Sequence, residues 1–251
     1  MVDQSPPVGL QFIIYRNRVQ EDLPGVLREA AAAGYAGVEA GNLFAIKSES
    51  EVKDLLAANG LVVCGLHSGY DDFTDESKLD SHLAYLEAVG ARHLMCSGVG
   101  ARDSLADYDR AAALFNRVGQ RCRQAGVDFC YHNHAWEFED LGGQKGIHRL
   151  AEATDPDLVK FNIDVYWVDV GGEDPAAFVR RYADRAGYFH FKDGEPGVFT
   201  ELGRGRVDLA ASLDAALEVG AEWIVYEQDQ TQIEPAESIA VSRQHLRALG
   251  V

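Results

Sequence analysis

The sequence lacks any long uninterrupted run of apolar residues, and none approaches the roughly 20 residues that a helix needs to cross a bilayer. Its first residues, MVDQSPPVGLQF, have neither the basic region nor the apolar core of a secretory signal. The composition is otherwise that of a globular chain, with 47% apolar and 25% charged residues, so extensive disorder is not expected. We therefore expect a cytoplasmic protein that has no membrane partner.

Cysteine and positive charge are both scarce. The four cysteines show no CxxC spacing, which argues against a zinc knuckle or a redox pair and favours buried free thiols. Lys and Arg number 23 against 40 Asp and Glu, giving a formal net charge of −17. Such a chain repels a phosphate backbone unless basic residues gather locally, and the densest basic segment, 117–123, has the spacing of a solvated helix face. Nucleic acid is therefore not an expected partner.

No Pro/Ser-rich linker divides the 251 residues, and no GxGxxG follows the first strand-like run as a dinucleotide-binding fold would suggest. Short β-branched or aromatic runs alternate with longer segments of helical period. The expected strands are 9–15, 37–40, 61–67, 93–97, 127–132, 159–165, 187–192 and 223–227. The expected helices are 22–33, 48–59, 77–89, 105–125, 145–153, 175–185, 208–219 and 235–248. Eight such units predict an α/β fold, a (β/α)8 TIM barrel formed as a single domain by residues 1–251.

Four of the expected strands end in residues of the kinds that bind metal ions. The fifth runs into YHNHAWEF, and the sixth, seventh and eighth end in FNIDVYW, YFHFKDG and WIVYEQD. Active sites of (β/α)8 barrels lie at the C-terminal ends of the strands, so we expect these residues to converge. The candidates are His132, His134, Glu137, Asp164, His190 and Glu227.

Carboxylates and neutral imidazoles from several strands can hold Mn²⁺, Mg²⁺, Co²⁺ or Zn²⁺ and leave positions open for the oxygens of a substrate. Such an ion polarises a carbonyl and stabilises an enediolate, so that a nearby base can abstract the α-proton at neutral pH. Lys192 lies two residues after His190, on the same side of the strand, and would lend positive charge to the oxyanion. His132 and His134 share one side of an extended strand, so both can face the barrel mouth.

Further side chains are expected at or near a substrate. His67 ends the third expected strand, where it either contacts substrate or hydrogen-bonds a neighbouring loop. His134 is a second candidate for substrate binding. Trp167 can form an apolar wall beside a sugar ring or pack in the core, and Arg204 can bind substrate or lie in a solvated loop after the seventh strand.

The motifs GYAGVE, YHNHAWEF, FNIDVYWV, HFKDG, ELGRGRVD and VYEQD occur in this order over nearly the whole chain. Together they resemble the sugar phosphate isomerase/epimerase superfamily, the xylose isomerase-like TIM barrels. Within it, the chain is most similar to a branch with YHNH on strand five, whose members are described as sugar isomerases or epimerases or as inosose dehydratase-like proteins. As a set, the motifs are specific for the superfamily and are weak guides to the substrate.

The resemblance implies one divalent metal ion at the ends of strands five to eight, with Asp164, His190 and Glu227 among its ligands. Many epimerases of the superfamily have a glutamate where this chain has His132, and there it both binds the metal and exchanges a proton. Glu137 is the nearest carboxylate in this chain. We expect Glu137 as the fourth ligand if the strand bends, with His132 as the alternative.

The function that follows is a divalent-metal-dependent sugar isomerase or epimerase acting on a small ketose or keto-polyol. Glu227, Lys192 and either Glu137 or His132 are the expected catalytic residues. With a histidine in the strand-five register a two-glutamate epimerase mechanism is in doubt, and the alternative is a dehydratase of an inosose or another keto-sugar, which is a lyase.

Two remoter alternatives use the same barrel. One is a phosphodiesterase like the apurinic-site endonucleases, which bind three zinc ions, but this chain has Trp167 where a histidine would be required. The other is a non-catalytic sugar-binding barrel. Homo-oligomers are common among similar barrels, and the absence of a Gly-rich phosphate loop favours an unphosphorylated substrate.

Overall fold

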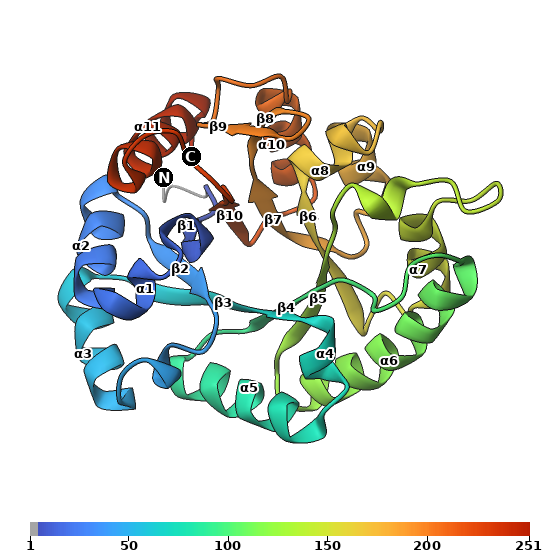
Figure 1. Cartoon of the computed structure of the whole chain (residues 1–251), viewed down its shortest axis with the longest axis horizontal. Helices are drawn as coiled ribbons and strands as arrows, with labels where there is room; N and C mark the ends of the chain where they lie inside the picture. The colour runs from blue at the N-terminus through green and yellow to red at the C-terminus, as the bar shows by residue number, and fades with distance from the viewer. Residues whose placement is uncertain (1–4) are drawn as a thin grey trace.

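Eight parallel strands form a closed barrel in the computed structural model, which describes residues 5–251 (Figure 1). Around the barrel the order is β1-β10-β7-β6-β5-β4-β3-β2, so the eight strands pair in the order in which they occur in the chain. They are β1 (Val8–Gln11), β2 (Gly37–Ala40), β3 (Val62–Gly69), β4 (His93–Ser97), β5 (Asp128–His132), β6 (Val159–Asp164), β7 (Ala186–Phe191) and β10 (Trp223–Tyr226). The predicted single-domain TIM barrel is confirmed.

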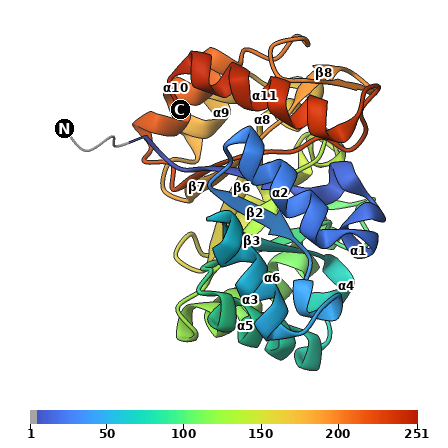
Figure 2. The ribbon, with the colours of Figure 1, turned by 90° about the vertical axis from the view of Figure 1, so that its left-hand side faces the viewer.

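Helices surround the barrel. Figure 2 shows α2, α3 and α11 lying outside the strands on the side that faces the viewer. The long helices are α2 (Leu23–Ala33), α3 (Glu49–Asn59), α5 (Glu76–Val89), α6 (Leu105–Gln124), α7 (Gly146–Ala153), α9 (Pro175–Arg181), α10 (Leu209–Glu218) and α11 (Pro235–Leu249). All eight expected helices are present, although the one expected over 175–185 ends at Arg181.

The first expected strand, 9–15, is only partly a strand. β1 ends at Gln11, and Phe12–Tyr15 form the 3₁₀ helix η1. The Gln11 side chain accepts a hydrogen bond from the backbone N–H of Ile13, which stabilises the start of this turn. A short apolar run cannot by itself distinguish a buried strand from a buried helical turn, which explains the error.

Several short elements that the sequence did not predict lie in the loops after the strands, at the C-terminal end of the barrel. They build the mouth above the strand ends. They are α1 (Arg18–Glu21), η2 (Leu43–Ala45), α4 (Tyr70–Phe73), η3 (Trp136–Phe138), α8 (Val165–Val170) and the antiparallel hairpin β8 (Asp193–Glu195) with β9 (Val198–Thr200).

The inside of the barrel is filled by side chains. One cluster within it consists of Cys64, Met95, Cys130, Tyr188 and Val225, all buried. In each strand these residues come before the polar residues at the C-terminal end, so they form a layer beneath the barrel mouth. All four cysteines of the chain are buried and free, as expected from their spacing.

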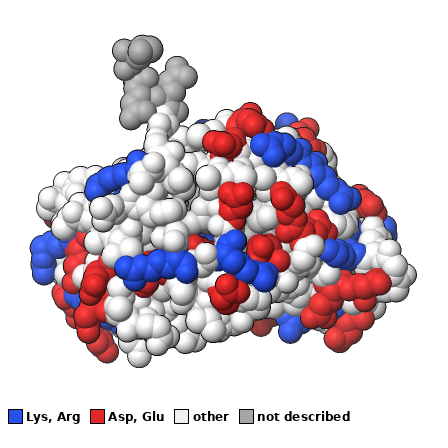
Figure 3. Space-filling model, turned by 90° about the horizontal axis from the view of Figure 1, so that it is seen from above, with Lys and Arg blue, Asp and Glu red and all other residues white. Residues whose placement is uncertain are grey.

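The surface carries charges of both signs. On the face shown in Figure 3, Lys and Arg lie among Asp and Glu and do not form one continuous basic patch. None of the helices between residues 5 and 251 is long and apolar enough to cross a membrane.

Candidate metal centre and active site

Two imidazoles and two carboxylates meet at the C-terminal end of the barrel. His132 ends β5, Asp164 ends β6, His190 lies near the end of β7 and Glu227 directly follows β10. One ligand atom from each lies within 4.8 Å of the other three, and all four residues are buried. The strand register accounts for part of this arrangement, because Asp164 is paired with His190 across β6 and β7.

Three buried polar atoms of this group have no hydrogen-bond partner. They are Oδ2 of Asp164, Nδ1 of His190 and Oε2 of Glu227. The last two contact each other, but not in the geometry of a hydrogen bond. Buried polar atoms without partners are costly, and a divalent cation bound by oxygen and nitrogen donors would satisfy all three. The donor set therefore fits a divalent metal ion.

Glu39 of β2 holds His190 from the side away from this group. Nε2 of His190 lies 2.8 Å from Oε2 of Glu39, which also accepts a hydrogen bond from the Tyr188 hydroxyl at 2.8 Å. Because a carboxylate only accepts, Nε2 is the donor and Nδ1 faces Glu227. Burial opposes ionisation of Glu39, but His190 and His67 hold its pKa at about 2. Carboxylates paired in this way fix the orientation of metal-binding histidines.

Lys192 is fully buried among three carboxylates. Its Nζ lies 3.0 Å from Oε1 of Glu227, 2.8 Å from Oδ2 of Asp229 and 3.4 Å from Oδ2 of Asp164. Burial disfavours the ammonium form, but Glu227 and Asp164 raise the pKa of Lys192 well above its ordinary value. Lys192 is therefore a permanent cation beside the ligand group.

Three of the grouped residues, Asp164, Glu227 and His132, differ in their preferred charge. Burial raises the pKa of Asp164 to about 6, against the attraction of Lys192 and with a contribution from Glu227. Burial acts on Glu227 too, yet Lys192 and His190 hold the pKa of Glu227 well below its ordinary value. Burial lowers the pKa of His132 well below its ordinary value, which leaves a neutral imidazole able to act as a ligand.

Glu137 lies outside this group. The chain turns after His132 instead of continuing as a strand, and Glu137 falls in η3. Its carboxylate accepts hydrogen bonds from the Tyr131 hydroxyl and from the backbone N–H of His134, the latter at 2.7 Å. The expected Glu137 ligand therefore does not match the structure, in which His132, the alternative, is the strand-five member of the group. Burial raises the pKa of Glu137 to about 7.

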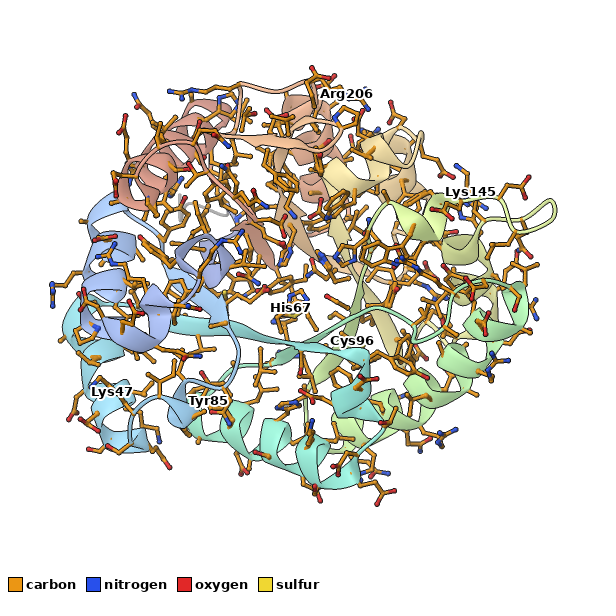
Figure 4. The ribbon with its side chains drawn as sticks, in the orientation of Figure 1. Lys47, His67, Tyr85, Cys96, Lys145 and Arg206 are labelled. Atoms are coloured by element: carbon orange, nitrogen blue, oxygen red, sulfur yellow. The ribbon has the colours of Figure 1, made fainter. Side chains whose placement is uncertain are left out.

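A cavity of about 510 Å³ opens beside the group and is lined by His67, His132, His134 and Glu227 among others. Small-molecule sites commonly have volumes of about 300–1,000 Å³. Figure 4 shows the His67 side chain pointing toward the centre of the barrel, whereas Lys47 lies at the periphery. The cavity therefore offers space for a small molecule next to the four candidate metal ligands.

Some of the residues predicted to contact substrate line the cavity and others do not. His134 lines the cavity and stacks on Trp136 with 3.9 Å between ring centroids. The Trp167 ring lies near Lys192, with 5.0 Å from Nζ to its centroid, but it does not line the cavity. Its backbone N–H donates to Asp164 at 3.0 Å, which places Trp167 next to a candidate ligand. Arg204 lies outside the cavity and contacts Glu201 at 3.0 Å.

Sequence reasoning missed three residues that line the cavity. Ser97 ends β4, and its hydroxyl contacts Nε2 of His67. Asp229 lies two residues after Glu227 and could have been found from the alternation of side chains along an extended segment. Arg16 follows η1 and left no signal, because that turn was expected to be a strand.

Comparisons with known proteins agree with this fold. The chain is 27% identical to the inosose dehydratase of Lacticaseibacillus casei over 262 residues, which cover 88% of this chain and 87% of the relative. Its structure is similar to that of a sugar phosphate isomerase/epimerase from Parabacteroides distasonis ATCC 8503, with a TM-score of 0.84, 22% identity and coverage of 99% and 96%. It is also similar to a D-allulose 3-epimerase from Methylomonas sp. in complex with D-allulose, with a TM-score of 0.74, 18% identity and coverage of 97% and 96%.

The resemblance inferred from the strand-end motifs is confirmed by a family profile. The profile of the xylose isomerase-like TIM barrels matches residues 27–249, which include every strand except β1. The proteins to which this chain is similar include a sugar phosphate isomerase/epimerase and inosose dehydratases. The chain belongs to the xylose isomerase-like TIM barrel family.

Proposed function

We propose that the protein is a divalent-metal-dependent sugar isomerase that removes a proton next to the carbonyl of a small ketose or keto-polyol. The observation that carries the proposal is the group of three buried atoms without hydrogen-bond partners on Asp164, His190 and Glu227 beside a cavity. A fold of this family supports many reactions, so this site, and not the barrel, supports the proposed function.

His132, Asp164, His190 and Glu227 are the proposed ligands. Two imidazoles and two carboxylates favour Mn²⁺, Co²⁺ or Zn²⁺ over Mg²⁺, which prefers oxygen ligands. A cation held there would polarise the substrate carbonyl and lower the pKa of the adjacent C–H. Glu39 acts indirectly by holding Nε2 of His190.

Glu227 is the proposed base, and Lys192 its partner. The depressed pKa of Glu227 keeps its carboxylate ionised, and the residue lines the cavity where a substrate would bind. Lys192 is a fixed positive charge 3.0 Å from Oε1 of Glu227, so it favours the negative charge that develops on the substrate oxygen. His132, His134 and His67 line the cavity and offer hydrogen bonds to sugar hydroxyls.

A single base favours isomerisation over epimerisation. One carboxylate can return the proton to the neighbouring carbon on the same face, whereas inversion at one carbon requires proton delivery from the opposite face. Glu137, the residue that could have supplied a second carboxylate, is held by Tyr131 and the His134 backbone. We therefore propose isomerisation ahead of the two-base epimerase mechanism.

Dehydration is the second candidate. It also begins with removal of an α-proton by one base, after which a β-hydroxyl leaves as water. Two observations favour it, namely the histidine in place of a strand-five carboxylate and the likeness to inosose dehydratase over 88% of the chain.

Proton NMR in D₂O with the Mn²⁺-loaded protein and a panel of ketoses, keto-polyols and inososes tests both candidates. Loss of an α-proton signal together with a new sugar isomer supports the isomerase. New vinyl signals identify a dehydratase. If no panel member exchanges a proton while metal is bound, the proposed substrate class is wrong.

A further inference from the structure

The cavity has a polar end and a second wall of different character. The polar end is formed by His132 and Glu227 of the ligand group together with His67 and His134. The second wall comes from the segment after β1, which contributes Phe12, Ile13, Arg16 and Val19. Arg16 is the sole Lys or Arg among the residues that line the cavity, within the part of the chain that the structure describes.

Within the described residues, 5–251, the charge of Arg16 is not paired with a carboxylate. Its Nη2 donates to the backbone carbonyl of Asp229 at 2.8 Å, and among residues 5–251 no carboxylate lies within 4.0 Å of its guanidinium. The Asp229 carboxylate instead accepts from Lys192 at 2.8 Å. The guanidinium is thus anchored at one nitrogen, and its other N–H groups remain free to bind an anion.

The backbone of Arg16 is unusual for a residue with a side chain. Its φ of 49° and ψ of −129° make it the one non-glycine residue with positive φ in the described part of the chain. These angles, followed by −62° and −23° at Asn17, are those of the two central positions of a type II′ turn. Glycine is preferred at the first position, so an arginine there strains the backbone.

Arg16 therefore occupies a position where glycine would be more stable, and it is an exposed residue that lines the cavity. We infer that Arg16 binds an anionic substituent of the substrate, so that the substrate is a keto-sugar carrying a carboxylate or a phosphate. This inference rests on the proposed function in one respect only, namely that the remainder of the substrate is a keto-sugar. It replaces the expectation that Arg204 supplies the basic contact, since Arg204 is paired with Glu201.

The negative residues nearby do not prevent anion binding. Glu227 and Asp229 both line the cavity, but each is 3.0 Å or less from Nζ of Lys192, which offsets part of their charge. An anion at Arg16 would meet an uncompensated guanidinium at the end of a cavity whose other end binds the sugar carbonyl. Planar guanidinium groups suit both carboxylate and phosphate, so the geometry does not separate these two.

The test compares three sugars that differ only at C6: D-fructose, D-fructuronate and D-fructose 6-phosphate. Calorimetric binding to the Mn²⁺-loaded protein is measured for the wild type, Arg16→Gln and Arg16→Gly, with Arg28→Gln on the exposed face of α2 as a matched control. We expect one or both anionic sugars to bind the wild type more tightly than fructose. Arg16→Gln should weaken that binding by about 10- to 100-fold and leave fructose and the control unchanged.

A second measurement separates binding from a purely structural role. Arg16→Gly should raise Tm by roughly 2 °C because it relieves the backbone, while it weakens anion binding as Arg16→Gln does. Arg16-dependent binding without turnover of any sugar would support this inference and contradict the proposed isomerase. If neither anionic sugar binds better than fructose, or if Arg16→Gln binds them as the wild type does, the inference is wrong.

Discussion

Nε2 of His190 lies 2.8 Å from Oε2 of Glu39, and this contact crosses the interior of the barrel from β7 to β2. The two strands are not neighbours in the sheet, so closure of the barrel is what brings the residues together. The contact turns Nδ1 of His190 toward Asp164 and Glu227. A buried carboxylate on a distant strand thereby determines which nitrogen would be available to a metal ion.

Replacing Glu39 with Gln should weaken binding of Mn²⁺ or Zn²⁺ by about 10- to 100-fold, because the amide no longer fixes the orientation of His190 with a charged hydrogen bond. Competition titration with a chelator measures the change. Glu87→Gln, an exposed position on α5, provides the control. An unchanged affinity would show that Glu39 does not orient a ligand.

Asp164→Asn should abolish metal binding and α-proton exchange while the barrel stays folded. The substitution removes one of the two carboxylates of the group but preserves the side-chain shape and the hydrogen bond from the Trp167 N–H. Metal content by mass spectrometry, circular dichroism and NMR exchange measure the three properties. The exposed Asp54→Asn on α3 should behave as the wild type. Retention of both metal and activity in Asp164→Asn would refute the proposed site.

Lys192→Met should reduce α-proton exchange by at least about 100-fold, because a fixed positive charge near the developing oxyanion is lost. The measurement is made with saturating metal, since loss of the buried ammonium leaves Glu227, Asp229 and Asp164 without their shared partner. Lys53→Met, in an exposed pair with Glu49, is the control. Normal exchange in a folded, metal-loaded Lys192→Met protein would exclude Lys192 from catalysis.

Glu137 should make the protein less stable as pH rises toward 8. Burial raises its pKa from 4.5 to about 7, so the folded state binds a proton more tightly than the unfolded state does. The contribution to stability is complete below about pH 4.5, is lost as pH rises through 7, and amounts to roughly 3 kcal/mol for a shift of this size.

Denaturant unfolding between pH 5 and 8 measures this effect as the difference between the wild type and Glu137→Gln. The amide cannot ionise, so the difference should grow in favour of the variant as pH rises. Parallel stability curves for the two proteins would mean that the Glu137 pKa is not raised in the folded state.

The sequence alone predicted the barrel because its evidence is local and repeated. Each strand such as 93–97 is a short apolar run followed by a helix with its own periodicity, and eight repetitions leave few alternative folds. The run 9–15 was the exception, since the apolar residues Phe12–Tyr15 are compatible with either a strand or a turn. The Gln11 side chain favours the turn. That error also concealed Arg16.

The candidate ligands Asp164, His190 and Glu227 were predictable because strand direction places the ends of parallel strands together. The choice of Glu137 or His132 as the strand-five ligand was not predictable, because it depends on where the chain leaves the strand. A turn after His132 directs Glu137 to Tyr131, and no periodicity in YHNHAWEF indicates that turn.

The amino-acid sequence by itself determined the alternation of strands and helices, the closed barrel and the strand ends that carry candidate metal ligands. These follow from side-chain periodicity and chain direction, which act over a few residues at a time. Only the tertiary structure decided which atoms are left without partners, that Glu39 holds His190 across the barrel, and that Arg16 keeps a free charge at the cavity. Those properties depend on contacts between segments far apart in the chain, and on the burial that alters the charge of each group.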